Sequence, residues 1–245
     1  MKKEYWIILI AYIAMQFSTI IGVPLVMFIG SLMGNSPAEM KIPAVAFWLI
    51  FSFAATLLIV LFLLRKEFRR DSETRNIANI PVSMGWAFAG VFLALIAQAT
   101  AASIESAIGV EMGSENTAQI LRLIESFPFV MLVSSVIGPI LEEIVFRKIL
   151  FGSLYKRFNF LIAALGSSVI FALAHGEPEH ILLYSAMGFT FAFLYVKTKR
   201  ILVPIFAHVA MNTFVVLVQS VYKEDIERMM REAEKIQGFI GGFFL

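Results

Sequence analysis

Apolar runs of about 20 residues recur along the whole of this 245-residue chain. A helix of that length crosses the hydrocarbon core of a membrane, so such runs are typical of membrane-spanning helices. The composition agrees, because 59% of the residues are hydrophobic and 16% are charged, whereas soluble domains carry roughly 25% charged residues. A soluble chain of this length could not bury so many helices that are apolar all round. The sequence therefore predicts an all-α fold, a polytopic bundle of transmembrane helices.

The apolar runs predict seven spans within one integral-membrane domain, residues 1–245, with no internal repeat. The first span follows Met-Lys-Lys and is too long for a signal peptide, so we expect an uncleaved anchor. Residues 104–126 suggest a short helix on the outer membrane face, and 222–238 a polar amphipathic tail. The predicted spans are 5–33, 43–64, 82–103, 127–147, 158–175, 181–196 and 201–221.

Lysine and arginine are distributed unequally between the two sides that this order of spans defines. The segments on the N-terminal side hold twelve of these residues, whereas the opposite loops hold only Lys41 and Arg122. Because cytoplasmic loops are enriched in Lys and Arg, we expect a cytoplasmic N-terminus in a multi-pass protein of the cell membrane. The compact size favours a prokaryotic cell. A net charge of +2 without a basic patch argues against nucleic acid as a partner, and the absence of cysteine excludes disulfides.

Three charged residues lie inside the predicted span 127–147, which is otherwise apolar: Glu142, Glu143 and Arg147. A carboxylate in hydrocarbon costs several kcal/mol, so an intramembrane acid indicates a functional site. Glu143 and Arg147 are four residues apart and are predicted to form an ion pair on one helix face. Glu142 lies about 100° round the helix and is left free for general-base work. The alternative is an inert cluster in which Arg147 and Lys148 extend to the headgroups.

Two further pairs of residues at four-residue spacing fall on the later spans. In Phe171-Ala-Leu-Ala-His175, the imidazole could orient a water molecule above the aromatic ring; the alternative is an interfacial histidine bonded to the following polar turn. In His208-Val-Ala-Met-Asn212, two neutral hydrogen-bond donors share a face and suit an oxyanion hole. The alternative there is a polar bond between helices, worth roughly 1 kcal/mol.

Taken in order, the three motifs Glu142-Glu143-x-x-x-Arg147, Phe171-x-x-x-His175 and His208-x-x-x-Asn212 resemble those of the CPBP family. These are the CAAX protease and bacteriocin-processing (Abi) intramembrane proteases, which include the Ras-converting-type CAAX endopeptidases. The resemblance covers about residues 127–215, the expected catalytic core. It implies an endopeptidase that hydrolyses peptide bonds of membrane-associated substrates. It also implies that Glu142 and His175 activate water, that His208 and Asn212 stabilise the oxyanion, and that Glu143, Arg147 and Phe171 support them.

Other expectations concern cofactors, partners and rival functions. No metal is expected, since the chain lacks a His-Glu-x-x-His motif. If the enzyme is metal-dependent, Glu142, His175 and His208 are the ligands that could hold zinc. The expected partners are a peptide or membrane-anchored protein substrate and the lipid bilayer. Two alternatives to a protease are a non-catalytic membrane scaffold or immunity factor and a small proton-coupled carrier, because intramembrane acids also mark ion pathways.

The depths of the candidate residues test whether they can meet. At ~1.5 Å per residue, Glu142 lies ~8 Å and His208 ~12 Å from the inner surface. A straight helix over 158–175 would place His175 at ~27 Å, near the outer surface. Convergence therefore requires that this span tilts or starts later, or that the turn after His175 enters a protein-lined cavity.

Overall fold

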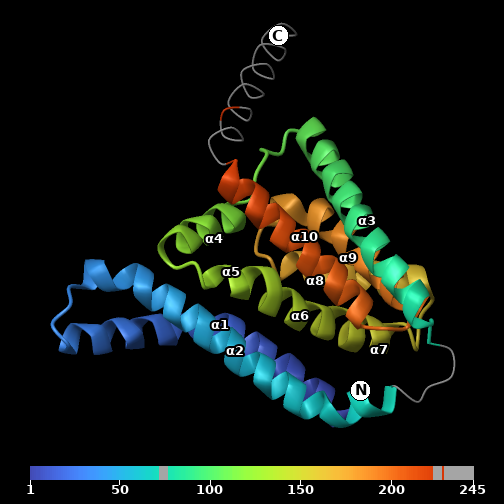
Figure 1. Ribbon diagram of the computed structural model, residues 1–245, viewed down its shortest axis with the longest axis horizontal. Helices are drawn as coiled ribbons and strands as arrows, with labels where there is room; N and C mark the ends of the chain where they lie inside the picture. The colour runs from blue at the N-terminus through green and yellow to red at the C-terminus, as the bar shows by residue number, and fades with distance from the viewer. Residues whose placement is uncertain (72–76, 223–227, 229–245) are drawn as a thin grey trace, which may run out of the picture.

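The computed structural model describes residues 1–71, 77–222 and 228 (Figure 1). Every regular element in these ranges is a helix, which confirms the predicted all-α class. The predicted tail 222–238 lies outside the described residues except for Tyr222 and Arg228. The α-helices are α1 (Lys3–Leu32), α2 (Pro37–Asp71), α3 (Ile80–Ala107), α4 (Glu115–Ser126), α5 (Val130–Leu132), α6 (Gly138–Glu142), α7 (Gly152–Leu154), α8 (Phe160–Leu173), α9 (Ile181–Thr198) and α10 (Leu202–Val221). Two π-helical segments, η1 (Val133–Ile137) and η2 (Glu143–Phe151), and one 3₁₀ turn, η3 (Pro178–His180), complete the order.

Five of the described helices are long and apolar enough to cross a membrane. They are Lys3–Leu32, Pro37–Glu67, Ile80–Ala107, Pro178–Thr198 and Leu202–Ser220. The other two predicted spans are helical as well. The span predicted at 127–147 is the continuous helical run from α5 to α7, and the span predicted at 158–175 is the shorter apolar helix α8.

The helices form two groups with the α5–α7 run between them (Figure 1). α1 and α2 pack side by side as a hairpin along one edge of the molecule. In the second group, α9 packs on α3 and α8, and α10 packs on α3. η1 contacts α2 and α10, and η2 contacts α1 and α8, so the helical run that carries the two glutamates touches both groups.

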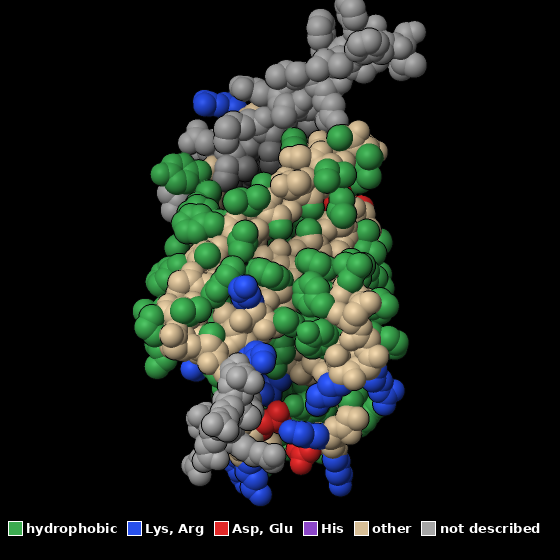
Figure 2. Space-filling model, turned by 90° about the vertical axis from the view of Figure 1, so that its right-hand side faces the viewer, with side chains coloured by type: hydrophobic (Ala, Val, Ile, Leu, Met, Phe, Trp, Pro, Cys, Tyr) green, Lys and Arg blue, Asp and Glu red, His purple; other side chains and the backbone are tan. Residues whose placement is uncertain are grey.

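The outer surface is apolar, as expected for a protein surrounded by lipid. Large hydrophobic side chains are widely exposed along α1, including Phe17, Ile20 and Ile21. On the face that Figure 2 shows, hydrophobic side chains cover most of the middle, and Lys and Arg side chains gather toward one end. A soluble monomer rarely exposes so much contiguous apolar surface, so these faces are the ones that lipid covers.

The predicted end of the fourth span, at Arg147, is wrong. The helical run continues to Leu154. The physical reason is that Lys148 finds an internal partner: it is buried, and its Nζ lies 3.4 Å from the Glu67 carboxylate on α2. Because Glu67 compensates the charge of Lys148 inside the protein, the helix can continue past this residue.

The predicted start of the fifth span, at residue 158, is also too early. The Asn159 side chain accepts a hydrogen bond from the Ile162 backbone N–H at 3.0 Å, and this cap starts α8 at Phe160. The helix ends at Leu173, and Gly176 follows with a φ of +73°, which only glycine adopts without strain. At ~1.5 Å per residue, α8 is ~21 Å long and shorter than a ~30 Å hydrocarbon core.

The helix predicted within 104–126 is present, but its bounds differ. The last turn of α3 extends to Ala107, and α4 begins at Glu115. Ser114 caps α4 by accepting a hydrogen bond from the Thr117 backbone N–H at 3.1 Å. No residue of α4 is fully buried, which fits a helix that lies at the periphery.

Candidate active site

The predicted ion pair between Glu143 and Arg147 is present and buried in η2. The Arg147 Nε lies 3.2 Å from the Glu143 Oε2, and both side chains are at most 1% exposed. The Arg147 guanidinium carbon lies 4.3 Å from the centre of the Phe171 ring, a cation–π contact. The other carboxylate oxygen, Oε1, lies 2.9 Å from the Nδ1 of His208. Both oxygens of Glu143 are therefore occupied by cationic or hydrogen-bonding partners.

Glu142 lies in a different environment one residue earlier. Its side chain is 20% exposed, and its Oε2 lies 3.8 Å from the Nε2 of His208. No described residue forms a hydrogen bond with it, and it interacts electrostatically with His175, Tyr12 and Tyr184. Glu142 is the more accessible and less constrained of the two carboxylates, as the sequence predicted from their positions on the helix.

His175 lies in the turn that follows α8. Its Nδ1 lies 2.8 Å from the Phe171 carbonyl oxygen. Since a carbonyl only accepts, Nδ1 carries the proton, and the Nε2 of the neutral ring is free to accept a hydrogen bond. The imidazole stacks on the ring of Tyr184, with the centroids 4.0 Å apart and the planes 23° from parallel.

Phe171 is the point at which the three motifs meet. Its ring centroid lies 4.5 Å from that of His175 and 6.1 Å from that of His208, and its face contacts Arg147. Phe171 itself is completely buried. His175 and His208 therefore converge on one buried ring, as the sequence analysis required of the candidate residues.

His208 and Asn212 lie one turn apart on α10. The His208 ring is buried and stacks on Phe191, with the centroids 4.5 Å apart. Asn212 is partly exposed, and no residue in the described ranges hydrogen-bonds its carboxamide. The amide is therefore available to a ligand.

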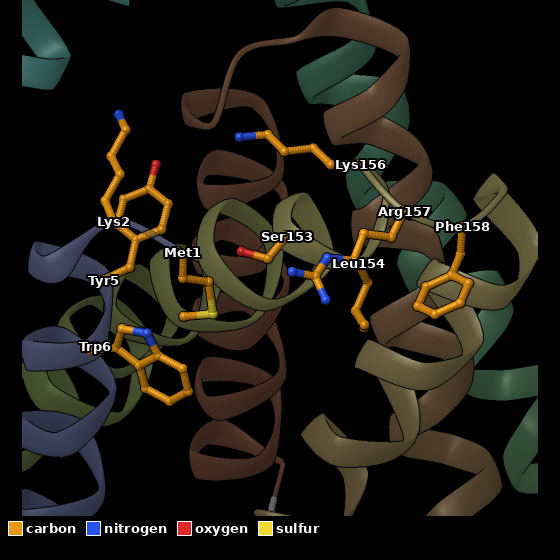
Figure 3. A pocket seen from close by; sticks show the side chains of 9 residues that line it. All are labelled: Met1, Lys2, Tyr5, Trp6, Ser153, Leu154, Lys156, Arg157 and Phe158. Atoms are coloured by element: carbon orange, nitrogen blue, oxygen red, sulfur yellow. The ribbon is translucent and has the colours of Figure 1, made fainter.

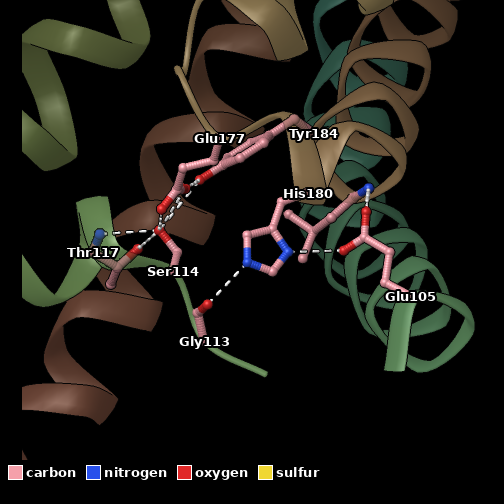
Figure 4. Close-up of polar contacts among 8 residues, drawn as sticks. Glu105, Gly113, Ser114, Thr117, Glu177, His180 and Tyr184 are labelled. Carbon is pink, nitrogen blue, oxygen red and sulfur yellow. Dashed lines mark hydrogen bonds and ion pairs between the residues drawn. The ribbon is translucent and has the colours of Figure 1, made fainter. Parts of the chain in front are cut away.

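A second polar cluster adjoins His175, and the sequence did not single out its members (Figure 4). Glu177 accepts hydrogen bonds from the Ser114 hydroxyl at 2.8 Å, from the Asn116 backbone N–H at 3.0 Å and from the Tyr184 hydroxyl. The Asn116 side chain donates in turn to the backbone carbonyl of His175. The start of α4 is thereby joined to the turn that holds His175. The only sequence signal was the polar turn at 176–180.

The hydrogen bonds to Glu177 also change its acidity. Burial alone would raise the pKa of this carboxyl group, but the hydrogen bonds from Tyr184, from the Asn116 backbone and from Ser114 outweigh it. The pKa of Glu177 lies below its ordinary value as a result. The group is held as a carboxylate that accepts from the surrounding donors.

The third histidine, His180, has a different set of partners. Its Nδ1 lies 3.0 Å from the Oε2 of Glu105, and its Nε2 lies 2.9 Å from the Gly113 carbonyl oxygen (Figure 4). Glu105 also accepts a hydrogen bond from the Leu183 backbone N–H at 2.9 Å. His180 therefore joins the end of α3 to the start of α9 and plays no part in the cluster around Phe171.

Two curated proteins resemble this chain over most or all of its length. The putative membrane peptidase YdiL of Bacillus subtilis (strain 168) is 48% identical, with both chains fully covered. The membrane-embedded CAAX protease MroQ of Staphylococcus aureus (strain USA300) is 34% identical over 76% of this chain and 78% of its own. The chain belongs to the CPBP family of CAAX-type membrane proteases.

The family model of the type II CAAX prenyl endopeptidase Rce1-like proteins matches residues 124–214 of this CPBP protease. That stretch contains all seven motif residues, from Glu142 to Asn212. No solved structure matches the chain.

A metal ion in this CPBP protease would need several His, Asp or Glu side chains that converge on one point. In the part of the chain that the structure describes, no three His, Asp or Glu side chains are arranged to hold one. The set named from the sequence, Glu142, His175 and His208, is not among such groups; within it, the Nε2 of His208 lies 3.8 Å from the Oε2 of Glu142, and the Nδ1 of His208 is bonded to Glu143.

Proposed function

We propose that this protein is an intramembrane endopeptidase that hydrolyses peptide bonds of membrane-associated substrates without a metal. The observation that supports it is the convergence of His175 and His208 on the buried ring of Phe171, with the accessible carboxylate of Glu142 3.8 Å from the Nε2 of His208. A non-catalytic scaffold would not need an accessible base beside two histidines and a carboxamide that no described residue hydrogen-bonds.

Glu142 and His175 would bind and activate the attacking water. The unprotonated Nε2 of His175 accepts one hydrogen bond from the water, because Nδ1 is held by the Phe171 carbonyl. The Glu142 carboxylate takes a proton as the oxygen attacks the scissile carbonyl carbon. It then returns that proton to the amine as the carbon–nitrogen bond breaks.

His208 and Asn212 would stabilise the negative oxygen of the tetrahedral intermediate. The Asn212 carboxamide can donate without rearrangement, since no described residue hydrogen-bonds it. His208 presents Nε2, and its Nδ1 faces the Glu143 carboxylate, which only accepts. Nε2 therefore carries a proton for the oxyanion only when both ring nitrogens are protonated. In this role Glu143 and Arg147 support the site rather than touching substrate.

We also propose how the protein is oriented in the membrane and in which membrane it lies. The uneven distribution of Lys and Arg supports a cytoplasmic N-terminus and a site that opens toward the cytoplasmic leaflet. The bacterial relatives support the cell membrane of a prokaryote as the location. The substrate would be a peptide or a membrane-anchored protein that enters between the helices.

The test is cleavage of a fluorogenic peptide library by the detergent-purified full chain and by Glu142→Gln, each with and without a strong chelator. We expect cleavage by the wild-type protein in both conditions and none by Glu142→Gln. Chelator-sensitive cleavage that zinc restores would overturn the metal-free mechanism. Equal cleavage by Glu142→Gln would overturn the assignment of the base. If the library is not cleaved at all, including by the wild type, the scaffold alternative becomes the better reading.

A further inference from the structure

A cavity of about 400 Å³ lies apart from the cluster around Phe171, between the start of α1 and the end of α7. Lys2 and Trp6 form one side, and Lys156, Arg157 and Phe158 form the other (Figure 3). Ser153 and Leu154 on α7 lie between the two sides. Its volume falls in the range of roughly 300–1,000 Å³ that small-molecule sites occupy.

The charges that line this cavity are all positive. Lys2, Lys156 and Arg157 contribute to the lining, and no acidic residue does. Lys2 is partly compensated, because its Nζ lies 3.2 Å from Glu67. In the described part of the chain, no carboxylate forms an ion pair with Lys156 or Arg157. The cavity therefore has a surplus of positive charge that an anion would neutralise.

Apart from Ser153, the remaining lining is mainly apolar, and it continues onto the exposed apolar surface. Trp6 is 56% exposed and Phe158 is 48% exposed. Tryptophan and other aromatic side chains gather where the membrane meets water. An anion that carries its own apolar part would satisfy both features, with its charge beside the basic residues and its chains along the exposed helices.

We propose that this cavity binds the phosphate headgroup of an anionic phospholipid. Basic pockets between membrane helices bind such headgroups through their positive charge. Phosphate accepts hydrogen bonds in a geometry that the guanidinium fork of Arg157 matches, while Lys156 and Lys2 act as point charges. The site is separate from the proposed protease mechanism and does not depend on it.

The test is lipid binding to the detergent-purified full chain, counted by native mass spectrometry during titration with phosphatidylglycerol or phosphatidylcholine. We expect the wild-type protein to bind phosphatidylglycerol about tenfold more tightly than phosphatidylcholine. In the variant Lys156→Gln/Arg157→Gln, affinity for phosphatidylglycerol should fall about 10- to 30-fold, while affinity for phosphatidylcholine stays unchanged.

A matched control removes the same charge elsewhere. Lys66→Gln/Lys199→Gln loses two exposed cations that do not line the cavity, and it should retain the preference for phosphatidylglycerol. An equal loss in this control, or no loss in Lys156→Gln/Arg157→Gln, would overturn the proposal. A third arm uses sn-glycerol 3-phosphate. If it binds as tightly as the lipid, the site is one for a free phosphate and the lipid assignment is wrong.

Discussion

Glu142 and Glu143 are adjacent in sequence but have opposite environments, and the helix geometry explains why. Glu143 faces the interior, where Arg147 and His208 occupy its two oxygens. Glu142 points about 100° away, and its side chain is 20% exposed. The π-helical geometry that begins at Glu143 is of a kind often found at functional sites. The two acids are thus suited to different tasks, one structural and one chemical.

Removal of Glu143 should destabilise the protein strongly. In Glu143→Ala, the buried Arg147 loses its counter-charge, which costs about 3–5 kcal/mol. The measurement is the free energy of unfolding in detergent. The control is Glu143→Ala/Arg147→Met, which removes both charges and should recover most of the lost stability. A single variant as stable as wild type would show that water or lipid compensates Arg147.

Removal of the Asn212 carboxamide should slow the reaction and leave the fold intact. Because the amide has no hydrogen-bond partner in the described part of the chain, Asn212→Ala should leave the melting temperature nearly unchanged. If the amide donates to the oxyanion, kcat should fall on the order of 10²–10³-fold. The neighbouring Thr213→Ala, which points to another side of α10, serves as the control. A loss below about threefold would remove Asn212 from the oxyanion hole.

The stacking of Tyr184 on His175 is expected to position the imidazole. Tyr184→Phe keeps the ring and should retain activity within a few fold, whereas Tyr184→Ala removes it and should lower kcat about tenfold. The comparison of kcat with KM for the two variants measures the effect. If both variants lose activity equally, the hydroxyl bond to Glu177 matters and the stacking does not.

The site residues that could be predicted are those linked by local spacing. Four-residue separation was sufficient for the Glu143–Arg147 pair, because one helix brings both side chains to one face. Glu177 was missed because its contact with Ser114 joins segments far apart in the chain, and Tyr184 was missed because its contact with His175 crosses the turn between α8 and α9. A single sequence contains no signal for such contacts beyond the polarity of a turn.

At the scale of elements, hydropathy predicts which segments are helical but not where helices end inside the protein. The ends of α7 and α8 were misjudged for this reason: one depends on the internal partner of Lys148 and the other on the cap at Asn159. The π-helical segments were missed as well, because an apolar run is compatible with either helix type.

The attachment of α4 to the His175 turn should depend on pH through Glu177. Because hydrogen bonds lower the pKa of this carboxyl group in the folded protein, its contribution to stability is complete above the unfolded value of about 4.3. The contribution is lost as the pH falls through the lower folded value. The difference in melting temperature between wild type and Glu177→Gln should therefore be largest near neutral pH and shrink in acid. Glu179→Gln, an exposed neighbour, is the control, and the same pH-dependent difference there would contradict the assignment to Glu177.

At the scale of the whole molecule, the all-helical membrane architecture was predictable because composition alone excludes a soluble fold of this length. The assembly of the helices was not. Lipid is as apolar as the helix faces, so hydropathy does not say which helices pack together. The sequence did not predict that the α5–α7 run lies between the α1–α2 pair and the other helices.

The orientation of the molecule can be tested directly, because the chain contains no cysteine. Single cysteines can be introduced at exposed positions on the two predicted sides, Lys199→Cys after α9 and Glu111→Cys between α3 and α4. With the N-terminus in the cytoplasm, a membrane-impermeant maleimide should label Glu111→Cys in intact cells. It should label Lys199→Cys only after the membrane is permeabilised. The reverse pattern would place the Lys- and Arg-rich end outside the cell, against the asymmetry of the loops. It would also turn the candidate active site toward the opposite leaflet.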